Sequence, residues 1–287
     1  MQANPLHVLS AASRHVPSAG AQVSETLLIA GATGALGNAV VQVLVGSQQF
    51  AGTTVLAREP IKTGMRGVTA RVVPAVRVPA NTHEAQGDKS GTFEDWPALT
   101  ATTGVILFDP PRMYYQRERA LWTPTPAQLP ALARWMRGCG VRTLAVVMPH
   151  VQGQLPGALK RGLANLDEQS VAALGFERLL IVRSAEKPGT GGVKRSWPAR
   201  AAHGVLAAMS YMVPSSEQPV RASKVAELVD VALRNMSPGT HVAAPELVWR
   251  AAQGHLPSVV GEWLHKPSAE PLSGAKSKHL LHEAITR

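Results

Sequence analysis

A glycine-rich turn between an apolar segment and a helix-compatible segment constrains the fold of this chain more than any other feature. Residues 26–30 (TLLIA) are a short apolar run, residues 31–37 have the sequence GATGALG, and the apolar segment 38–45 then continues without a helix breaker until Gly46. Strand, glycine turn and helix in this order are the context that a phosphate-binding turn requires. The segment therefore predicts the first strand–helix unit of an α/β fold.

Each glycine of the turn has a separate expected role. Gly31 lets the chain leave the strand in a tight turn, Gly34 lets the backbone approach a pyrophosphate, and Gly37 lets the helix pack close to the strand. The helix N-terminus then presents free N–H groups and the positive end of its dipole to the phosphates. These expectations predict a dinucleotide-binding turn.

The end of the next strand bears on which dinucleotide is bound. Residues 53–57 (TTVLA) are β-branched and apolar, and Arg58 follows them directly. An acidic side chain at this position accepts from the 2′-hydroxyl of NAD, whereas arginine pairs with the 2′-phosphate of NADP. Glu59 is adjacent, but its side chain is expected on the opposite face of the strand. Arg58 thus favours NADP over NAD, with a solvated arginine at a strand end as the alternative.

Apolar runs and helix-compatible segments continue to alternate along the chain. Further strands are expected at 67–73, 104–108, 142–148 and 176–182, and helices at about 126–137, 155–174 and 223–235, with a loop over 74–89. Strands spaced by helices imply a parallel sheet covered on both faces. The predicted fold class is α/β: a Rossmann-type doubly wound parallel sheet with a small C-terminal substrate-side lobe.

The same pattern gives the expected domain organisation. Residues 1–24 contain no acidic side chain and are expected to form a flexible N-terminal extension. Residues 25–287 are expected to form a single NAD(P)-binding domain, of which 184–287 contribute the smaller lobe.

Charge and cysteine content narrow the expected partners. Lys and Arg number 29 against 19 for Asp and Glu, which gives a net charge of +10, but the basic residues are scattered and no RNA-binding or zinc-finger pattern accompanies them. Nucleic acid is therefore a disfavoured partner. The single cysteine, Cys139, permits neither an internal disulfide nor a cysteine-based metal site. No segment approaches the roughly 18 apolar residues of a membrane span. We expect a cytoplasmic protein with no metal and no membrane contact.

From Thr26 to about Arg183 the chain resembles the atypical short-chain dehydrogenase/reductases of the NmrA-like and Tat-interacting-protein-like type. The resemblance lies in the turn at 31–37, in 55–58 (VLAR) and in 175–183 (GFERLLIVR). It implies a Rossmann domain that binds NAD(P) over the carboxyl edge of the sheet, with Ser184 and Ala185 near the nicotinamide. Together with the turn and Arg58, it gives these expected cofactor-binding residues: Gly31, Thr33, Gly34, Ala35, Leu36, Gly37, Arg58, Phe108, Asp109 and Pro110.

The catalytic pattern of that family is missing. Its active members have Ser or Thr after the fifth strand and then Tyr-x-x-x-Lys on the next helix, and the tyrosine acts as general acid and base. In this chain Pro149 stands at the hydroxyl position, Lys160 at the tyrosine position and Ala164 at the lysine position. His150 could donate a proton at neutral pH, and Lys160 could lie near the cofactor, but a surface location is the alternative for His150.

Other side chains offer no clearer catalytic candidate. Tyr114 and Tyr115, with Arg112, follow the fourth strand and could reach the nicotinamide pocket, although such aromatic pairs usually pack on neighbours. Asp109 precedes two prolines and is expected to be fixed by turn geometry rather than to act as a base. The catalytic residues are therefore unknown from the sequence.

Two functions remain open at this point. The first is an NADPH-dependent reductase of a small carbonyl, quinone or flavin. Reduction of a quinone or a flavin tolerates the loss of the tyrosine best, because solvent can supply the proton to these acceptors. The second is a non-catalytic NADP-dependent sensor or regulator that binds a protein partner. The expected partners are a dinucleotide together with a small-molecule acceptor or a protein.

Overall fold

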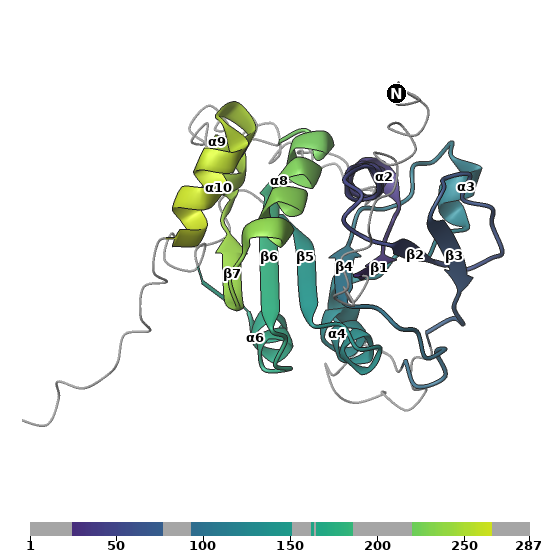
Figure 1. Ribbon diagram of the computed structural model, residues 1–287. Coiled ribbons are helices and arrows are strands. Elements are labelled where there is room, and N and C mark those ends of the chain that lie inside the picture. Colours follow the sequence, from purple (N-terminus) through teal and green to yellow (C-terminus); the bar gives the residue numbers. More distant parts are fainter. Residues whose placement is uncertain (1–24, 77–92, 151–161, 164, 186–219, 266–287) are drawn as a thin grey trace, which may run out of the picture.

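A seven-stranded parallel sheet organises the chain (Figure 1). The computed structural model describes residues 25–76, 93–150, 162–163, 165–185 and 220–265. The strands are β1 (Thr26–Ala30), β2 (Gly52–Ala57), β3 (Val68–Val72), β4 (Thr103–Leu107), β5 (Thr143–His150), β6 (Arg178–Ala185) and β7 (Gly239–Ala243). Their order is β3-β2-β1-β4-β5-β6-β7, and every neighbouring pair is parallel. This is the doubly wound Rossmann order with one further strand, β7, at the edge.

The strand sequences agree with their places in the sheet. All five residues of β4 are buried, as are four of the five in β1, because helices cover both faces of the sheet there. The edge strand β3 has only Val68 buried, and its remaining residues are more polar and more exposed. Since all strands are parallel, their carboxyl ends lie along one edge of the sheet, which we call the carboxyl edge.

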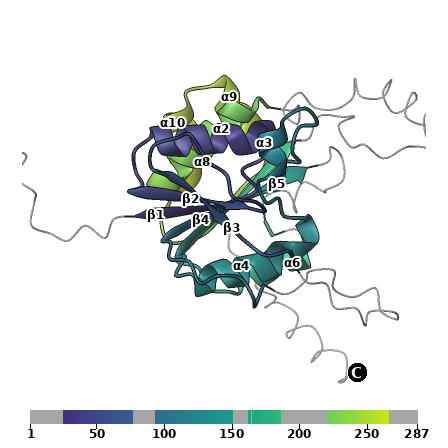
Figure 2. The ribbon, with the colours of Figure 1, turned by 90° about the vertical axis from the view of Figure 1, so that its right-hand side faces the viewer.

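Helices cover both faces of the sheet (Figure 2). The helices are α2 (Gly34–Gly46), α3 (Gln116–Arg119), α4 (Leu129–Gly138), α6 (Leu166–Ala172), α8 (Ala222–Asn235), α9 (Pro245–Gln253) and α10 (Leu256–His265), and a 3₁₀ turn, η1 (Pro126–Gln128), precedes α4. Seen along the sheet, α2, α8, α9 and α10 lie on one side and α4 and α6 on the other. No helix in the described ranges is both long and apolar enough to cross a membrane.

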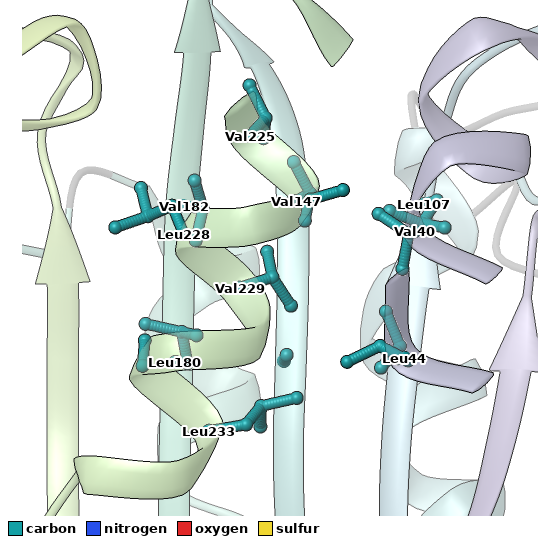
Figure 3. Packing of buried hydrophobic residues seen from close by; sticks show 14 of the residues in the cluster. Val40, Leu44, Leu107, Val147, Leu180, Val182, Val225, Leu228, Val229 and Leu233 are labelled. Atoms are coloured by element: carbon teal, nitrogen blue, oxygen red, sulfur yellow. The ribbon is translucent and has the colours of Figure 1, made fainter. Parts of the chain in front are cut away.

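On the first face, α2 and α8 pack side by side over the sheet (Figure 3). Apolar residues recur on α8 at spacings of three and four, which places them on one face of the helix. This face of α8 meets residues of β5 and β6, and α2 covers β4 beside it. The labelled residues of this cluster are Val40, Leu44, Leu107, Val147, Leu180, Val182, Val225, Leu228, Val229 and Leu233.

A polar link also ties α8 to the end of α2. The Gln49 side-chain amide donates to Asp230 at 3.0 Å, across 181 residues of sequence. Asp230 also accepts from Arg234 at 2.6 Å within α8. The described C-terminal residues, 220–265, are therefore packed into the same core as the N-terminal strand–helix unit.

The second face is built around aromatic side chains and a buried ion pair. The rings of Trp96 and Trp122 meet edge to face with centroids 4.8 Å apart, and Phe93 and Trp135 pack on Trp96 in the same way. Further along the sheet, the Arg183 guanidinium of β6 lies 2.7 Å from a carboxylate oxygen of the α6 residue Glu168, with both side chains almost fully buried. These contacts fix the helix layer that includes α4 and α6.

The predicted fold class is confirmed by the strand order and the two helix layers. All six expected strands and the helix predicted at 223–235 have their observed counterparts within a few residues. The helix expected at about 155–174 is described only from Leu166, and the loop expected at 74–89 lies mostly outside the described residues. The N-terminal extension 1–24 lies entirely outside them, and the small C-terminal lobe, 184–287, stays a prediction.

Candidate functional site

The glycine turn joins β1 to α2 with two close backbone contacts. Gly31 has a φ of +85°, and a Cβ added to it would lie 1.9 Å from the carbonyl oxygen of Leu107 at the end of β4. A Cβ added to Gly37 would lie 2.6 Å from the carbonyl oxygen of Gly31. Glycine at these two positions therefore lets the turn pass over β4 and lets α2 start directly against the strand.

The first turn of α2 binds two carboxylate groups from a distant segment. The Gly34 N–H donates to a carboxylate oxygen of Glu118 at 3.1 Å, and the Leu36 N–H donates to a carboxylate oxygen of Asp109 at 2.7 Å. Thr33 gives no side-chain cap to the helix and instead donates through its hydroxyl to the Asp109 carbonyl oxygen at 2.5 Å. Free N–H groups and the helix dipole favour anions here, and this turn holds two.

Gly34 allows one of these anions to approach. It has a φ of +69°, and a Cβ added to it would lie 2.2 Å from the Asp109 carboxylate. The sequence predicted that Gly34 makes room for a pyrophosphate. In the structure, the space beside Gly34 is filled by the Asp109 side chain, which is an anion as well.

Glu118 is the more strongly bound of the two carboxylates. Its side chain is 6% exposed and forms an ion pair with the guanidinium of Arg112. It also accepts from the Arg112 backbone N–H at 2.8 Å and from the Asn38 side-chain amide at 2.9 Å. Burial alone would raise the pKa of Glu118, but these Arg112 and Gly34 hydrogen bonds together lower it. Glu118 is therefore a well-compensated buried anion.

Asp109 is bound less favourably. Its burial, and then the nearby charge of Glu118, raise the pKa of the Asp109 carboxyl above its ordinary value. Hydrogen bonds from the backbone N–H groups of Leu36 and Ala35 act in the opposite direction, as does the charge of Arg112, but they do not cancel the increase. Two like charges at one helix N-terminus thus repel each other.

The chain that follows Glu118 runs along the end of β2. The Trp122 N–H donates to the Leu56 carbonyl at 3.0 Å, and the Arg58 N–H donates to the Ala120 carbonyl at 2.7 Å. Between these two hydrogen bonds, Leu121 forms an antiparallel bridge with Ala57. The Thr123 hydroxyl then lies 3.0 Å from that of Thr33. We call residues 109–124 the crossing segment, because they leave β4 and cross the carboxyl edge over β1 to reach β2.

Arg58 and the residues after β4 lie around this arrangement. Arg58 and Glu59 are both exposed directly after β2. Phe108 is half-buried against the core on the second face of the sheet, Asp109 is half-buried on the glycine turn, and Pro110 is exposed. The structure thus brings Asp109, but not Pro110, against the turn residues that the sequence predicted.

The tip of the crossing segment is exposed. Tyr114 is 90% exposed and Met113 is 73% exposed, while the Arg112 guanidinium lies over the Tyr115 ring at 3.8 Å from its centroid. Figures 1 and 2 show the short helix α3, which follows this tip, next to α2. The two tyrosines therefore do not line an enclosed pocket in this structure.

The weak catalytic candidates lie at or beyond the end of β5. His150 is the last residue of β5 and so lies at the carboxyl edge, beside the exposed Pro149. The Lys160 and Ala164 positions lie outside the described residues. Cys139 is buried, and burial raises the pKa of its thiol, which disfavours the reactive thiolate. The described ranges contain no group of three His, Cys, Asp or Glu residues that could hold a metal ion.

Sequence reasoning missed two residues of this arrangement, Asn38 and Glu118, and it expected Arg112 near the nicotinamide pocket rather than in an ion pair with Glu118. Arg112 and Glu118 lie in a segment of mixed charge, 112–119 (RMYYQRER), which has neither an apolar period nor a motif. Asn38 follows the last glycine of the turn, four residues after Gly34, and its side-chain amide donates to the Gly34 carbonyl at 2.6 Å. Only the tertiary structure shows that these residues meet.

Comparison with known proteins gives weak likenesses. No protein-family model matches the chain, and no curated protein matches it. Among solved structures, it is similar to a nucleoside-diphosphate-sugar epimerase from Staphylococcus aureus, with 13% identity, coverage of 77% of this chain and 71% of that one, and a TM-score of 0.41. It is also similar to uronate dehydrogenase from Agrobacterium tumefaciens, with 12% identity, coverage of 76% and 75%, and a TM-score of 0.40. A third similar structure is the Bordetella bronchiseptica enzyme WbmH in complex with NAD⁺, with 13% identity, coverage of 80% and 81%, and a TM-score of 0.37. The strand order of the sheet defines the fold as a Rossmann-type α/β fold.

Proposed function

We propose that this protein binds a nicotinamide dinucleotide at the glycine turn, with NADP preferred over NAD. The observation that carries the proposal is the pair of carboxylates on the N–H groups of Gly34 and Leu36. They indicate that the first turn of α2 is an anion site, and it lies beside the point where the strand order reverses between β1 and β4. Rossmann proteins bind the pyrophosphate at this place in the sheet.

Arg58 supports the preference for NADP. It follows β2 directly and its side chain is exposed. In Rossmann domains this position faces the ribose of the adenosine half, where a guanidinium pairs with the 2′-phosphate. Glu59 has the opposite charge but, as the next residue along an extended chain, is expected to point away from the same ribose.

We favour a regulatory role for the bound dinucleotide. When bound, a nicotinamide dinucleotide supplies a hydride, but a reductase of the family that the sequence resembles also needs a hydroxyl and a Tyr-x-x-x-Lys pair. Pro149, with no hydroxyl, occupies the carboxyl edge at the end of β5. The exposed Met113 and Tyr114 lie on the same segment as Asp109. These two side chains form an exposed surface that would move when a dinucleotide binds at the glycine turn. A sensor that binds a protein partner requires such a surface.

A reductase is the second candidate, and His150 favours it. This residue ends β5 at the carboxyl edge, on the side of β1 that the nicotinamide half occupies in Rossmann enzymes. An imidazole there could donate a proton near neutral pH. A flavin or quinone acceptor fits best, since such acceptors can also take their proton from solvent.

Calorimetric titration with NADPH, NADP⁺, NADH and NAD⁺ tests the proposal. We expect saturable binding of the two phosphorylated forms and at least about tenfold weaker binding of the other two, which corresponds to about 1.4 kcal/mol. Arg58→Ala should remove this preference. Arg142→Ala, an exposed arginine at the opposite edge of the sheet, is the matched control and should leave it unchanged. Saturable binding without any preference would contradict the NADP assignment.

Turnover then separates the two roles. A regulator should oxidise no NADPH with a panel of carbonyls, quinones and flavins, and its affinities for NADP⁺ and NADPH should differ. NADPH oxidation that falls in His150→Ala would instead establish the reductase.

A further inference from the structure

We propose that the crossing segment is an internal competitor of the dinucleotide: the Asp109 and Glu118 carboxylates occupy the phosphate positions of the glycine turn, and binding of a dinucleotide requires their displacement. The inference rests on the proposed function, because it concerns access to the same turn. It goes further in assigning an autoinhibitory role to residues 109–124.

The first step of the argument is the occupation of the donors. The N–H groups of Gly34 and Leu36 each already donate to a carboxylate oxygen, at 3.1 and 2.7 Å. The space beside Gly34 is also filled, since even a single added carbon would lie 2.2 Å from the Asp109 side chain. A phosphate group is larger than a methyl group, so it cannot enter while Asp109 is in place.

The second step concerns the ribose side of the crevice. β1 pairs with β2 only as far as Val55, and the backbone of Ala120–Trp122 takes its place beside Leu56 and Ala57. The adenosine ribose of a Rossmann protein lies at this end of β2. One continuous segment therefore covers both the phosphate and the ribose positions.

The third step is that the carboxylates of the segment can be replaced by another anion. Burial and the charge of Glu118 both disfavour the ionised Asp109 carboxylate, so its contact with the turn contributes little to holding the segment in place. Glu118 is held mainly by Arg112, whose side chain is 41% exposed. Arg112 belongs to the same segment. An incoming phosphate can therefore replace the carboxylates on the N–H groups of Gly34 and Leu36. Since Arg112 moves with the segment, Glu118 can keep its ion pair when it leaves the turn.

Binding measurements on charge-neutral variants test the inference. We compare NADPH binding by the unmodified protein, Asp109→Ala, Glu118→Gln and the double variant. Asp109→Ala removes the side chain that fills the space beside Gly34, and Glu118→Gln weakens the acceptor of the Gly34 N–H. Each single variant should bind about tenfold more tightly and the double variant more tightly still, because the apparent affinity rises with the population of the open state. Glu227→Gln, which also removes one negative charge, but from an exposed ion pair with Lys224 on α8, is the matched control and should bind as the unmodified protein does.

The outcomes separate this inference from the proposed function. If the unmodified protein binds NADPH as tightly as folded variants do, or more tightly, the competitor role is wrong while dinucleotide binding stands. If the double variant is folded and binds none of the four dinucleotides, both proposals are wrong. If only the variants bind, both are supported and the unmodified protein is closed.

A variant of Glu118 loses the contact with Arg112, and this loss could affect folding. Hydrogen exchange of the unmodified protein gives a second measurement that needs no such variant. Addition of saturating NADPH should reduce the amide protection of peptides from 109–124, whereas peptides from α8 should be unchanged. Protection of 109–124 that rises or stays constant while NADPH binds would overturn the inference.

Discussion

Gly34 is the residue at which the local fold and the proposed site depend on each other most directly. Its φ of +69° favours glycine, and its missing Cβ leaves room for the Asp109 carboxylate. We predict that Gly34→Ala lowers the free energy of unfolding by about 1–3 kcal/mol, the usual cost of backbone strain at one residue. It should also abolish dinucleotide binding. Urea unfolding and calorimetry measure the two effects.

Gly46 provides the matched control for this prediction. It lies in the last turn of the same helix, and a Cβ added there meets nothing within 4 Å. Gly46→Ala should therefore leave the free energy of unfolding unchanged or raise it by up to about 1 kcal/mol. Equal effects of the two substitutions would show that Gly34 has no special role.

Asp109 and Glu118 should give opposite pH dependences of stability. The folded pKa of Asp109 is raised by burial and by Glu118, so the ionised carboxylate lowers the stability of the fold. This loss of stability is complete above the folded pKa, and it is absent below the unfolded pKa of about 4. Burial acts to raise the pKa of Glu118 too, but hydrogen bonds from Arg112 lower it overall. Glu118 therefore contributes stability above about pH 4.3 that is lost as the pH falls through its folded pKa.

Urea unfolding of two variants between pH 7 and pH 4 checks these signs. Asp109→Asn should raise the free energy of unfolding at pH 7, with a gain that disappears toward pH 4. Glu118→Gln should lower it at pH 7 by about 1–3 kcal/mol, and this loss should begin to shrink only below about pH 4.5. The same sign for both variants would contradict the electrostatic account of the turn.

At the scale of elements, the contact of α8 with the sheet and α2 accounts for much of the first core layer. Leu228 is buried at the centre of the cluster in Figure 3, whereas its neighbour Glu227 lies in an exposed ion pair. Leu228→Ala should lower the free energy of unfolding by about 2–5 kcal/mol, and Glu227→Ala should change it by less than about 0.5 kcal/mol. A Leu228→Ala loss below 1 kcal/mol in urea unfolding would contradict this packing.

Elements with a strong local pattern could be predicted from the sequence. The alternation of apolar runs and glycine turns gave β1, β2, β4 and β5, and the spacing of apolar residues gave α8. The crossing segment could not be predicted, because its structure depends on contacts far apart in sequence. The Leu36 N–H bond to Asp109 spans 73 residues, and the Gly34 N–H bond to Glu118 spans 84. No propensity or periodicity within 109–124 encodes such a contact.

For the molecule as a whole, the sequence placed the candidate site at one edge of the sheet, and that location of the site stays a prediction. The glycine turn, Arg58, Asp109 and His150 were each expected near the carboxyl ends of strands, and parallel pairing brings those ends to one edge. The carboxylates on α2 change the interpretation of this edge, because they are anions supplied by the chain itself. The central claim is therefore that the turn is an anion site for which a dinucleotide and the crossing segment compete.

Backbone amide chemical shifts of ¹⁵N-labelled protein during titration with NADPH test that claim most directly. The account predicts saturable shifts of the amides of Gly34, Leu36 and Arg58, together with those of the crossing segment, and no shift of Arg142 at the opposite edge. In the Asp109→Ala, Glu118→Gln double variant, the same shifts should saturate at lower NADPH concentration. Saturable shifts confined to other parts of the sheet, or none in either protein, would contradict the account.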